Sequence, residues 1–132
     1  MKQAFLVAGL GFGDEGKGAV VDAIARKYSD STVVRYNGGP QAGHNVVTPE
    51  GKNHTFAQIG SGAFVNETKT YLSRFMKIDP LSFLNELNRA KTVGIKDHQA
   101  VFDPQCIIIT PFHAAMNRLR ETFRGKERYG SC

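Results

Sequence analysis

The start of the chain joins an apolar run, a glycine-rich stretch and an amphipathic segment, and this order constrains the fold more than any other feature. Residues 4–10 form a continuous apolar run, which predicts a buried strand of a partly parallel sheet. From Val20 to Ala25, apolar residues recur at helical spacing, which predicts a helix over residues 17–27. We therefore expect an α/β fold that begins with a strand, a phosphate-loop-like turn and a helix.

A second strand and a hairpin are expected next. Residues 32–36 are β-branched or aromatic, which favours a strand, and an Asn-Gly-Gly-Pro sequence ends it. Residues 45–48 and 54–56 flank Pro49-Glu50-Gly51, a typical turn sequence. The pattern predicts a small antiparallel hairpin attached to a mostly parallel sheet.

The second half of the sequence predicts two helices and a short strand. Asp79-Pro80 is typical of a helix N-terminus, and Gly94 is placed to close that helix. Residues 107–109 predict a short buried strand, and Thr110-Pro111 opens a helix that we expect to run to about Arg124. No repeat or linker divides the chain, so we expect one domain or part of one.

Composition narrows the class of protein. The formal net charge of +5 favours anionic partners, but the basic residues are spread out except from Arg118 to Arg128, so phosphate-bearing small molecules fit at least as well as nucleic acid. No stretch approaches the roughly 18 apolar residues of a membrane span. The two cysteines, Cys106 and Cys132, are too few for a disulfide framework and suit a reducing compartment. We expect a cytoplasmic protein that binds neither membrane nor nucleic acid.

The glycine-rich stretch from Gly11 to Gly18 matches the G-x-x-x-x-G-K core of a phosphate-binding loop. Glycines let backbone N–H groups approach phosphates, Lys17 adds a positive charge, and the following helix N-terminus favours the same anion. Gly18 stands where such loops usually carry a magnesium-binding hydroxyl, so Asp14 becomes the candidate for metal or proton chemistry. The alternative is a plain turn in which Asp14 and Glu15 are solvated acids of a first helical turn.

A second glycine-rich segment spans residues 35–45 and includes His44. A single loop histidine is more often a surface residue than a functional one. However, loops that follow successive parallel strands emerge at the same edge of a sheet. Asp14, Lys17 and His44 are therefore expected to converge on one site.

Three strings in this order, GDEGKG, VVRYNGG and AGHNVV, resemble the N-terminal signature of the adenylosuccinate synthetases. Gly60-Ser61-Gly62 is similar to the family's Pro-Ser-Gly, and Gly130-Ser131-Cys132 stands where the family has Gly-Thr-Thr. The resemblance implies that residues 1–132 are the N-terminal part of a longer domain, and that the chain is truncated and inactive alone.

The resemblance also implies a reaction. GTP, with ATP as the alternative, would phosphorylate the 6-oxygen of IMP, and L-aspartate would then displace the phosphate in a homodimeric ligase. Asp14 would be the base at the purine N1 and a Mg²⁺ ligand, His44 the acid, and the backbone of Gly43 a second Mg²⁺ ligand. The implied nucleotide contacts are Gly13, Asp14, Glu15, Gly16, Lys17, Gly18, Asn37, Gln41, Ala42, Gly43, His44, Ser131 and Cys132.

Several positions depart from the family pattern. Phe12 replaces the usual Trp, Gln41 the usual Asn, and Ser131-Cys132 the usual Thr-Thr, which indicates a divergent branch. Relatives that act on dGMP commonly lack the aspartate at the base position, so the retained Asp14 favours IMP. A dGMP-using enzyme and a non-catalytic nucleotide-binding module remain the alternatives.

A generic P-loop hydrolase is disfavoured by two positions. Gly18 removes the hydroxyl that would bind the metal in such an enzyme. The candidate for the second metal-binding aspartate is Asp103, which we interpret as a turn residue before Pro104.

Overall fold

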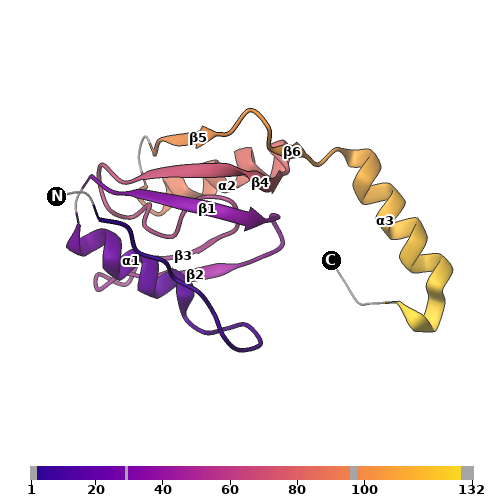
Figure 1. Ribbon diagram of the computed structural model, residues 1–132, viewed down its shortest axis with the longest axis horizontal. Helices are drawn as coiled ribbons and strands as arrows, with labels where there is room; N and C mark the ends of the chain where they lie inside the picture. The colour runs from indigo at the N-terminus through magenta and orange to yellow at the C-terminus, as the bar shows by residue number, and fades with distance from the viewer. Residues whose placement is uncertain (1–2, 29, 96–97, 129–132) are drawn as a thin grey trace.

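The structure, a computed structural model, describes residues 3–28, 30–95 and 98–128. Its centre is a parallel sheet in which β4 (Lys69–Ile78) pairs with β1 (Thr32–Gly38), as Figure 1 shows. β5 (Ala100–Phe102) pairs with the first half of β4 and β6 (Ile107–Ile108) with its end, both in parallel. This sheet confirms the predicted fold class.

The antiparallel hairpin is also confirmed. β2 (His44–Val47) pairs with β3 (Asn53–Phe56), and the two form a separate sheet. Val46 of β2 and Phe56 of β3 are buried and belong to one core cluster with residues of the next helix. The hairpin therefore packs on the body of the molecule.

Three helices form where the sequence predicts them. α1 (Lys17–Lys27), α2 (Pro80–Thr92) and α3 (Pro111–Arg124) match their expected ranges, and a short 3-10 turn, η1 (Gly125–Glu127), follows α3. Asp79 caps α2 by accepting the N–H groups of Leu81 and Ser82, both at 3.1 Å. α3 extends away from the rest of the molecule in Figure 1. None of the helices in the described ranges could span a membrane.

The strand predicted at residues 4–10 does not form. Residues 3–10 are irregular, and the side chains of Leu6 and Leu10 are 93% and 100% exposed. A strand needs a neighbour for its backbone N–H and C=O groups, and no described strand pairs with this run. The run lies against α1 instead, where the rings of Phe5 and Tyr28 are 4.8 Å apart.

Burial also differs from the predicted pattern at the helices and at β6. The buried face of α2 consists of Phe83, Glu86 and Ala90, whereas Leu81 and Leu84 are exposed, although apolar residues of a helix are expected on its buried face. The expected buried strand at the end of the sheet is exposed, because both residues of β6 are about half accessible. β4 and β5 are strands that the sequence analysis did not predict.

Candidate nucleotide site

The glycine-rich loop has the backbone of an anion-binding turn. Gly13, Asp14 and Gly16 have φ angles of 109°, 50° and 72°, and α1 begins at the next residue, Lys17. A left-handed Asp costs of order 1 kcal/mol, and such strain is typical of functional loops. The N–H groups of a helix point towards its N-terminus, and those in the first turn of α1 lack partners within the helix, so they are available to an anion at this loop.

Asp14 is exposed and stands alone in this loop. Its side chain has no hydrogen-bond or ion-pair partner among the described residues. Glu15, by contrast, accepts a hydrogen bond from the Gly11 N–H and pairs with the ammonium of Lys17. These contacts hold the pKa of Glu15 below its usual value, with Lys17 as the main cause. The neighbouring acids Asp14 and Glu15 thus have different surroundings.

His44 lies directly against the start of α1. A Cβ placed on Gly18 would come within 3.0 Å of the His44 Cβ and 3.4 Å of the Asn45 carbonyl oxygen. A side chain at position 18 would therefore crowd the contact between α1 and β2. The first loop and the second glycine-rich segment do meet, at Gly18 and His44.

The surroundings of His44 lower the pKa of its imidazole below the usual value. Burial lowers its pKa, and the positive charges of Arg35 and Lys17 lower it further. A neutral imidazole can donate one N–H to a ligand while its other nitrogen accepts. A bound anion would oppose this shift, because it favours the protonated form.

The segment behind this site is rigidly packed. A Cβ at Gly60 would lie 2.8 Å from the Val33 Cβ of β1, and a Cβ at Gly62 would lie 2.7 Å from the Ala25 Cβ of α1. The Gly60-Ser61-Gly62 sequence is therefore a packing element that brings α1 and β1 together. It packs against the two elements that carry Lys17 and Arg35.

Sequence reasoning missed Arg35, which has no role in the predicted set. Its Nη1 atom is buried without a hydrogen-bond partner in the described part of the chain. Burial lowers the pKa of its guanidinium, and the carboxylate of Glu86 partly opposes this. The available signal was its position on β1, nine residues before His44, within the second glycine-rich segment.

The remaining predicted residues lie around this centre or outside it. Asn37 is exposed near the end of β1, and residues 41–43 are exposed in the loop that leads to His44. Ser131 and Cys132 lie outside the described residues. Asp103 accepts the Gln105 N–H at 2.9 Å and the Tyr71 hydroxyl at 2.9 Å, as expected for a turn residue.

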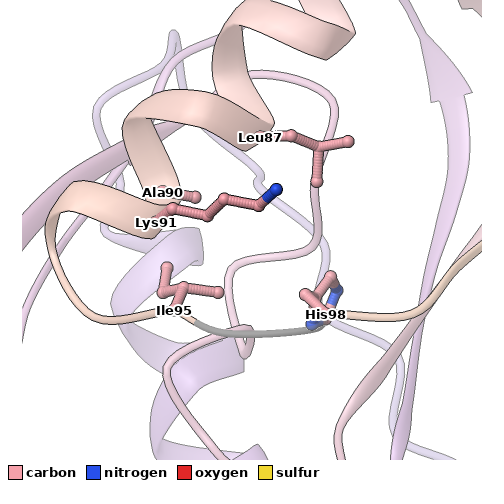
Figure 2. A pocket seen from close by; sticks show the side chains of 5 residues that line it. All are labelled: Leu87, Ala90, Lys91, Ile95 and His98. Carbon is pink, nitrogen blue, oxygen red and sulfur yellow. The ribbon is translucent and has the colours of Figure 1, made fainter.

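The described residues line hollows on the surface, and two of them bear on where the site lies. One is lined by residues 5–9 together with Glu15, Lys17, Val20 and Ile24, so it lies beside the phosphate loop. The other is formed by Leu87, Ala90, Lys91, Ile95 and His98, with α2 on one side, and Figure 2 shows both apolar and nitrogen-bearing side chains around it. The first hollow contains predicted site residues and the second contains none.

Comparison with known proteins decides the family. The adenylosuccinate synthetase family profile matches residues 6–132, nearly the whole chain. The chain belongs to the adenylosuccinate synthetase family. It is 32% identical to the adenylosuccinate synthetase of Mycobacterium leprae over 128 residues, covering 97% of this chain and 29% of the relative. It is 33% identical to the adenylosuccinate synthetase of Tolumonas auensis, over 99% of this chain and 30% of that relative.

Solved structures of an adenylosuccinate synthetase and of a cyanophage synthetase share the fold of this chain. The fully ligated adenylosuccinate synthetase of Plasmodium falciparum matches with a TM-score of 0.73 and 29% identity, over 87% of this chain and 26% of that protein. The cyanophage S-2L succinoaminodeoxyadenylate synthetase, bound to dGMP and dATP, matches with a TM-score of 0.62 and 18% identity. The match covers 86% of this chain and 30% of that protein. The chain thus spans less than a third of the length of its family relatives.

Proposed function

We propose that this chain supplies the phosphate loop and the acid–base groups of an adenylosuccinate synthetase. In this reaction GTP phosphorylates the 6-oxygen of IMP, and L-aspartate then displaces the phosphate to form a C–N bond. The observation that carries the proposal is the contact between Gly18 and His44, because it joins a phosphate-binding helix start to a titratable ring. Family membership supports the same assignment.

The two catalytic side chains have different tasks. A purine carbonyl becomes a nucleophile when a base removes the N1 proton, and Asp14 is an exposed carboxylate suited to that role. His44 would donate a hydrogen bond to the transferring phosphoryl group, and Lys17 would hold phosphate. Asn37, Gln41 and the backbone of residues 42–43 would complete the nucleotide contacts, with Ser131 and Cys132.

Magnesium would be held mainly by the substrates. Within residues 3–28, 30–95 and 98–128, no three acidic, histidine or cysteine side chains gather closely enough to hold a metal. One carboxylate, Asp14, with the Gly43 carbonyl fits Mg²⁺, which usually keeps several waters and binds substrate phosphates. When bound, the ion would offset phosphate charge.

The retained Asp14 supports IMP as the substrate. The matched cyanophage synthetase is bound to dGMP, but its 18% identity supports the shared fold and not a shared substrate. A dGMP-using reaction is therefore the second candidate, with ATP as the corresponding alternative to GTP. We further propose that the active protein is a cytoplasmic homodimer.

The test joins this chain to the remainder of the Tolumonas auensis enzyme and measures adenylosuccinate formation from IMP, aspartate and GTP. Asp14→Asn and His44→Asn should each lower kcat by about 100-fold or more, because each removes an acid–base group. Lys17→Ala should also raise the KM for GTP. Asp30→Asn makes the same charge change as Asp14→Asn on an exposed residue outside the loop and should leave the rate unchanged.

Two results would contradict the proposal. If Asp14→Asn retained a rate within about threefold of the parent, Asp14 would be a solvated acid and not the base. A higher kcat/KM for dGMP than for IMP would reject the substrate assignment and favour the second candidate.

A further inference from the structure

The carboxylate of Glu15 lies where a phosphate would be expected to bind. One oxygen, Oε1, accepts the Gly11 backbone N–H at 2.5 Å, and the other, Oε2, pairs with the Lys17 ammonium. A backbone N–H and the motif lysine are the two kinds of group that a phosphate-binding loop offers to its ligand. The Glu15 carboxylate therefore occupies the donors that the motif would offer to a bound phosphate.

The carboxylate also lies close to the loop backbone. A Cβ placed on Gly9 would come within 2.0 Å of the Glu15 Oε2, and one on Gly11 within 3.0 Å of Oε1. The Glu15 side chain is 24% exposed, so it is turned towards residues 9–11 instead of extending into water. Glycine at these two positions leaves room for the acid.

We propose that Glu15 occupies the phosphate position of the loop in the ligand-free chain, and that a phosphate group binds by displacing it. The inference rests on the proposed nucleotide function and adds a specificity-determining residue to it. The Glu15 carboxylate and a phosphate oxygen are both anionic acceptors, so they compete for the single Gly11 N–H and for the charge of Lys17. Each phosphate that binds must release the Glu15 side chain to solvent.

Displacement favours ligands that carry several negative charges. A ligand with one phosphate gains little more from the loop than the carboxylate it replaces. A diphosphate or triphosphate reaches the loop N–H groups, Lys17 and the start of α1 together, so it gains more than Glu15 loses. Glu15 therefore raises the preference of the loop for polyphosphates over inorganic phosphate.

The alternative role for Glu15 is structural: its contacts would stabilise the loop in its binding conformation. The two roles predict opposite effects of removing the charge. Glu15→Gln has a similar shape, but its neutral amide is a weaker partner for Lys17. If Glu15 competes with the ligand, Glu15→Gln binds phosphate ligands more tightly. If Glu15 stabilises the binding conformation of the loop, Glu15→Gln binds them more weakly.

The experiment titrates the 132-residue chain with pyrophosphate and, separately, with inorganic phosphate by isothermal calorimetry, without metal. The variants are Glu15→Gln, Lys17→Ala and the matched charge control Asp30→Asn, each checked for folding by its urea midpoint. We expect Glu15→Gln to lower the Kd for pyrophosphate about fivefold, as for removal of an exposed competing charge. The preference for pyrophosphate over phosphate should fall in the same variant, and Lys17→Ala should weaken binding.

Three outcomes overturn the inference. They are weaker or unchanged pyrophosphate binding by Glu15→Gln, an equal gain in Asp30→Asn, and no pyrophosphate binding by any variant. The proposed ligase function fails separately, through the turnover assay. Tighter binding by Glu15→Gln supports the displacement even if the joined enzyme forms no adenylosuccinate.

Discussion

Two glutamate carboxylates in this molecule each hold a loop through backbone N–H groups, in opposite surroundings. Glu86 of α2 is 7% exposed and accepts the N–H groups of residues 57–59 at 2.8, 2.8 and 3.1 Å. Glu15 holds Gly11 and Lys17 on an exposed loop. Water or a ligand can take over the bonds of Glu15, whereas the donors around Glu86 have no such substitute. The same kind of hydrogen bond is thus structural at Glu86 and exchangeable with a ligand or water at Glu15.

The strongest test of this comparison removes each carboxylate in turn. Glu86→Ala leaves three backbone N–H groups without their acceptor, two of them in buried residues, and should cost about 3 kcal/mol or more of unfolding free energy. Urea unfolding of the 132-residue chain measures this loss. Glu15→Ala should leave the urea midpoint unchanged, because water replaces the carboxylate. Equal midpoints for the two variants would contradict the comparison.

A smaller effect is expected from crowding the loop that Glu86 holds. Gly60→Ala places a methyl group 2.8 Å from Val33 and from the Thr70 hydroxyl oxygen, which should cost about 1–3 kcal/mol. Gly11→Ala is the matched change in the other loop, where the nearest atom is the flexible Glu15 carboxylate at 3.0 Å. In thermal unfolding, the Tm of Gly60→Ala should be clearly lower than that of Gly11→Ala. A reversed order would show that the loop of residues 57–62 can move aside.

The smallest effect is a loss of stability in mild acid. Burial lowers the pKa of His54 and of His98 below the ordinary 6.5, and His98 is hydrogen-bonded to Thr70 at 2.7 Å. Below pH 6.5 the unfolded chain takes up protons that the folded chain resists, so the unfolding free energy falls as the pH falls towards the folded pKa values. His54 faces Glu86, which opposes its shift, and Arg89, which adds to it.

Urea unfolding at pH 7.5 and 5.5 checks this direction, and the decrease should be smaller than that caused by Gly60→Ala. His54→Leu and His98→Asn should each reduce the pH dependence, because each removes one titrating group. Stability that stays constant or rises between pH 7.5 and 5.5 would show that these histidines are not protected from protonation.

Local signals in the sequence predicted the helices and the hairpin, but not the centre of the sheet. Asp79-Pro80 and Thr110-Pro111 are signals carried by neighbouring residues, and the helices begin where they predict. β4 mixes Lys69, Arg74 and Lys77 with apolar residues, so its pattern gives no clean alternation, although Leu72 is fully buried. It pairs with strands that are distant in sequence, β1, β5 and β6, and no local window contains them.

The N-terminal run shows the opposite failure. Residues 4–10 have the composition of a buried strand, yet Leu10 is fully exposed because pairing depends on neighbours that composition cannot specify. For the site, the expected convergence of Asp14, Lys17 and His44 stays a prediction, although Gly18, the neighbour of Lys17, does lie against His44. The partners of Glu15 and the buried Arg35 depend on side-chain placement, so the sequence could not predict them.

The projecting helix α3 is expected to unfold separately from the sheet, so one free energy of unfolding does not describe both. None of its fourteen residues is buried, and Phe112, Leu119 and Phe123 are exposed along one face. An uncovered helix of this length is marginal in water, because forming its first turn costs more conformational entropy than one hydrogen bond returns. Its helix–coil equilibrium is therefore nearly independent of whether the sheet is folded, and it can fray and re-form many times within the lifetime of one folded sheet.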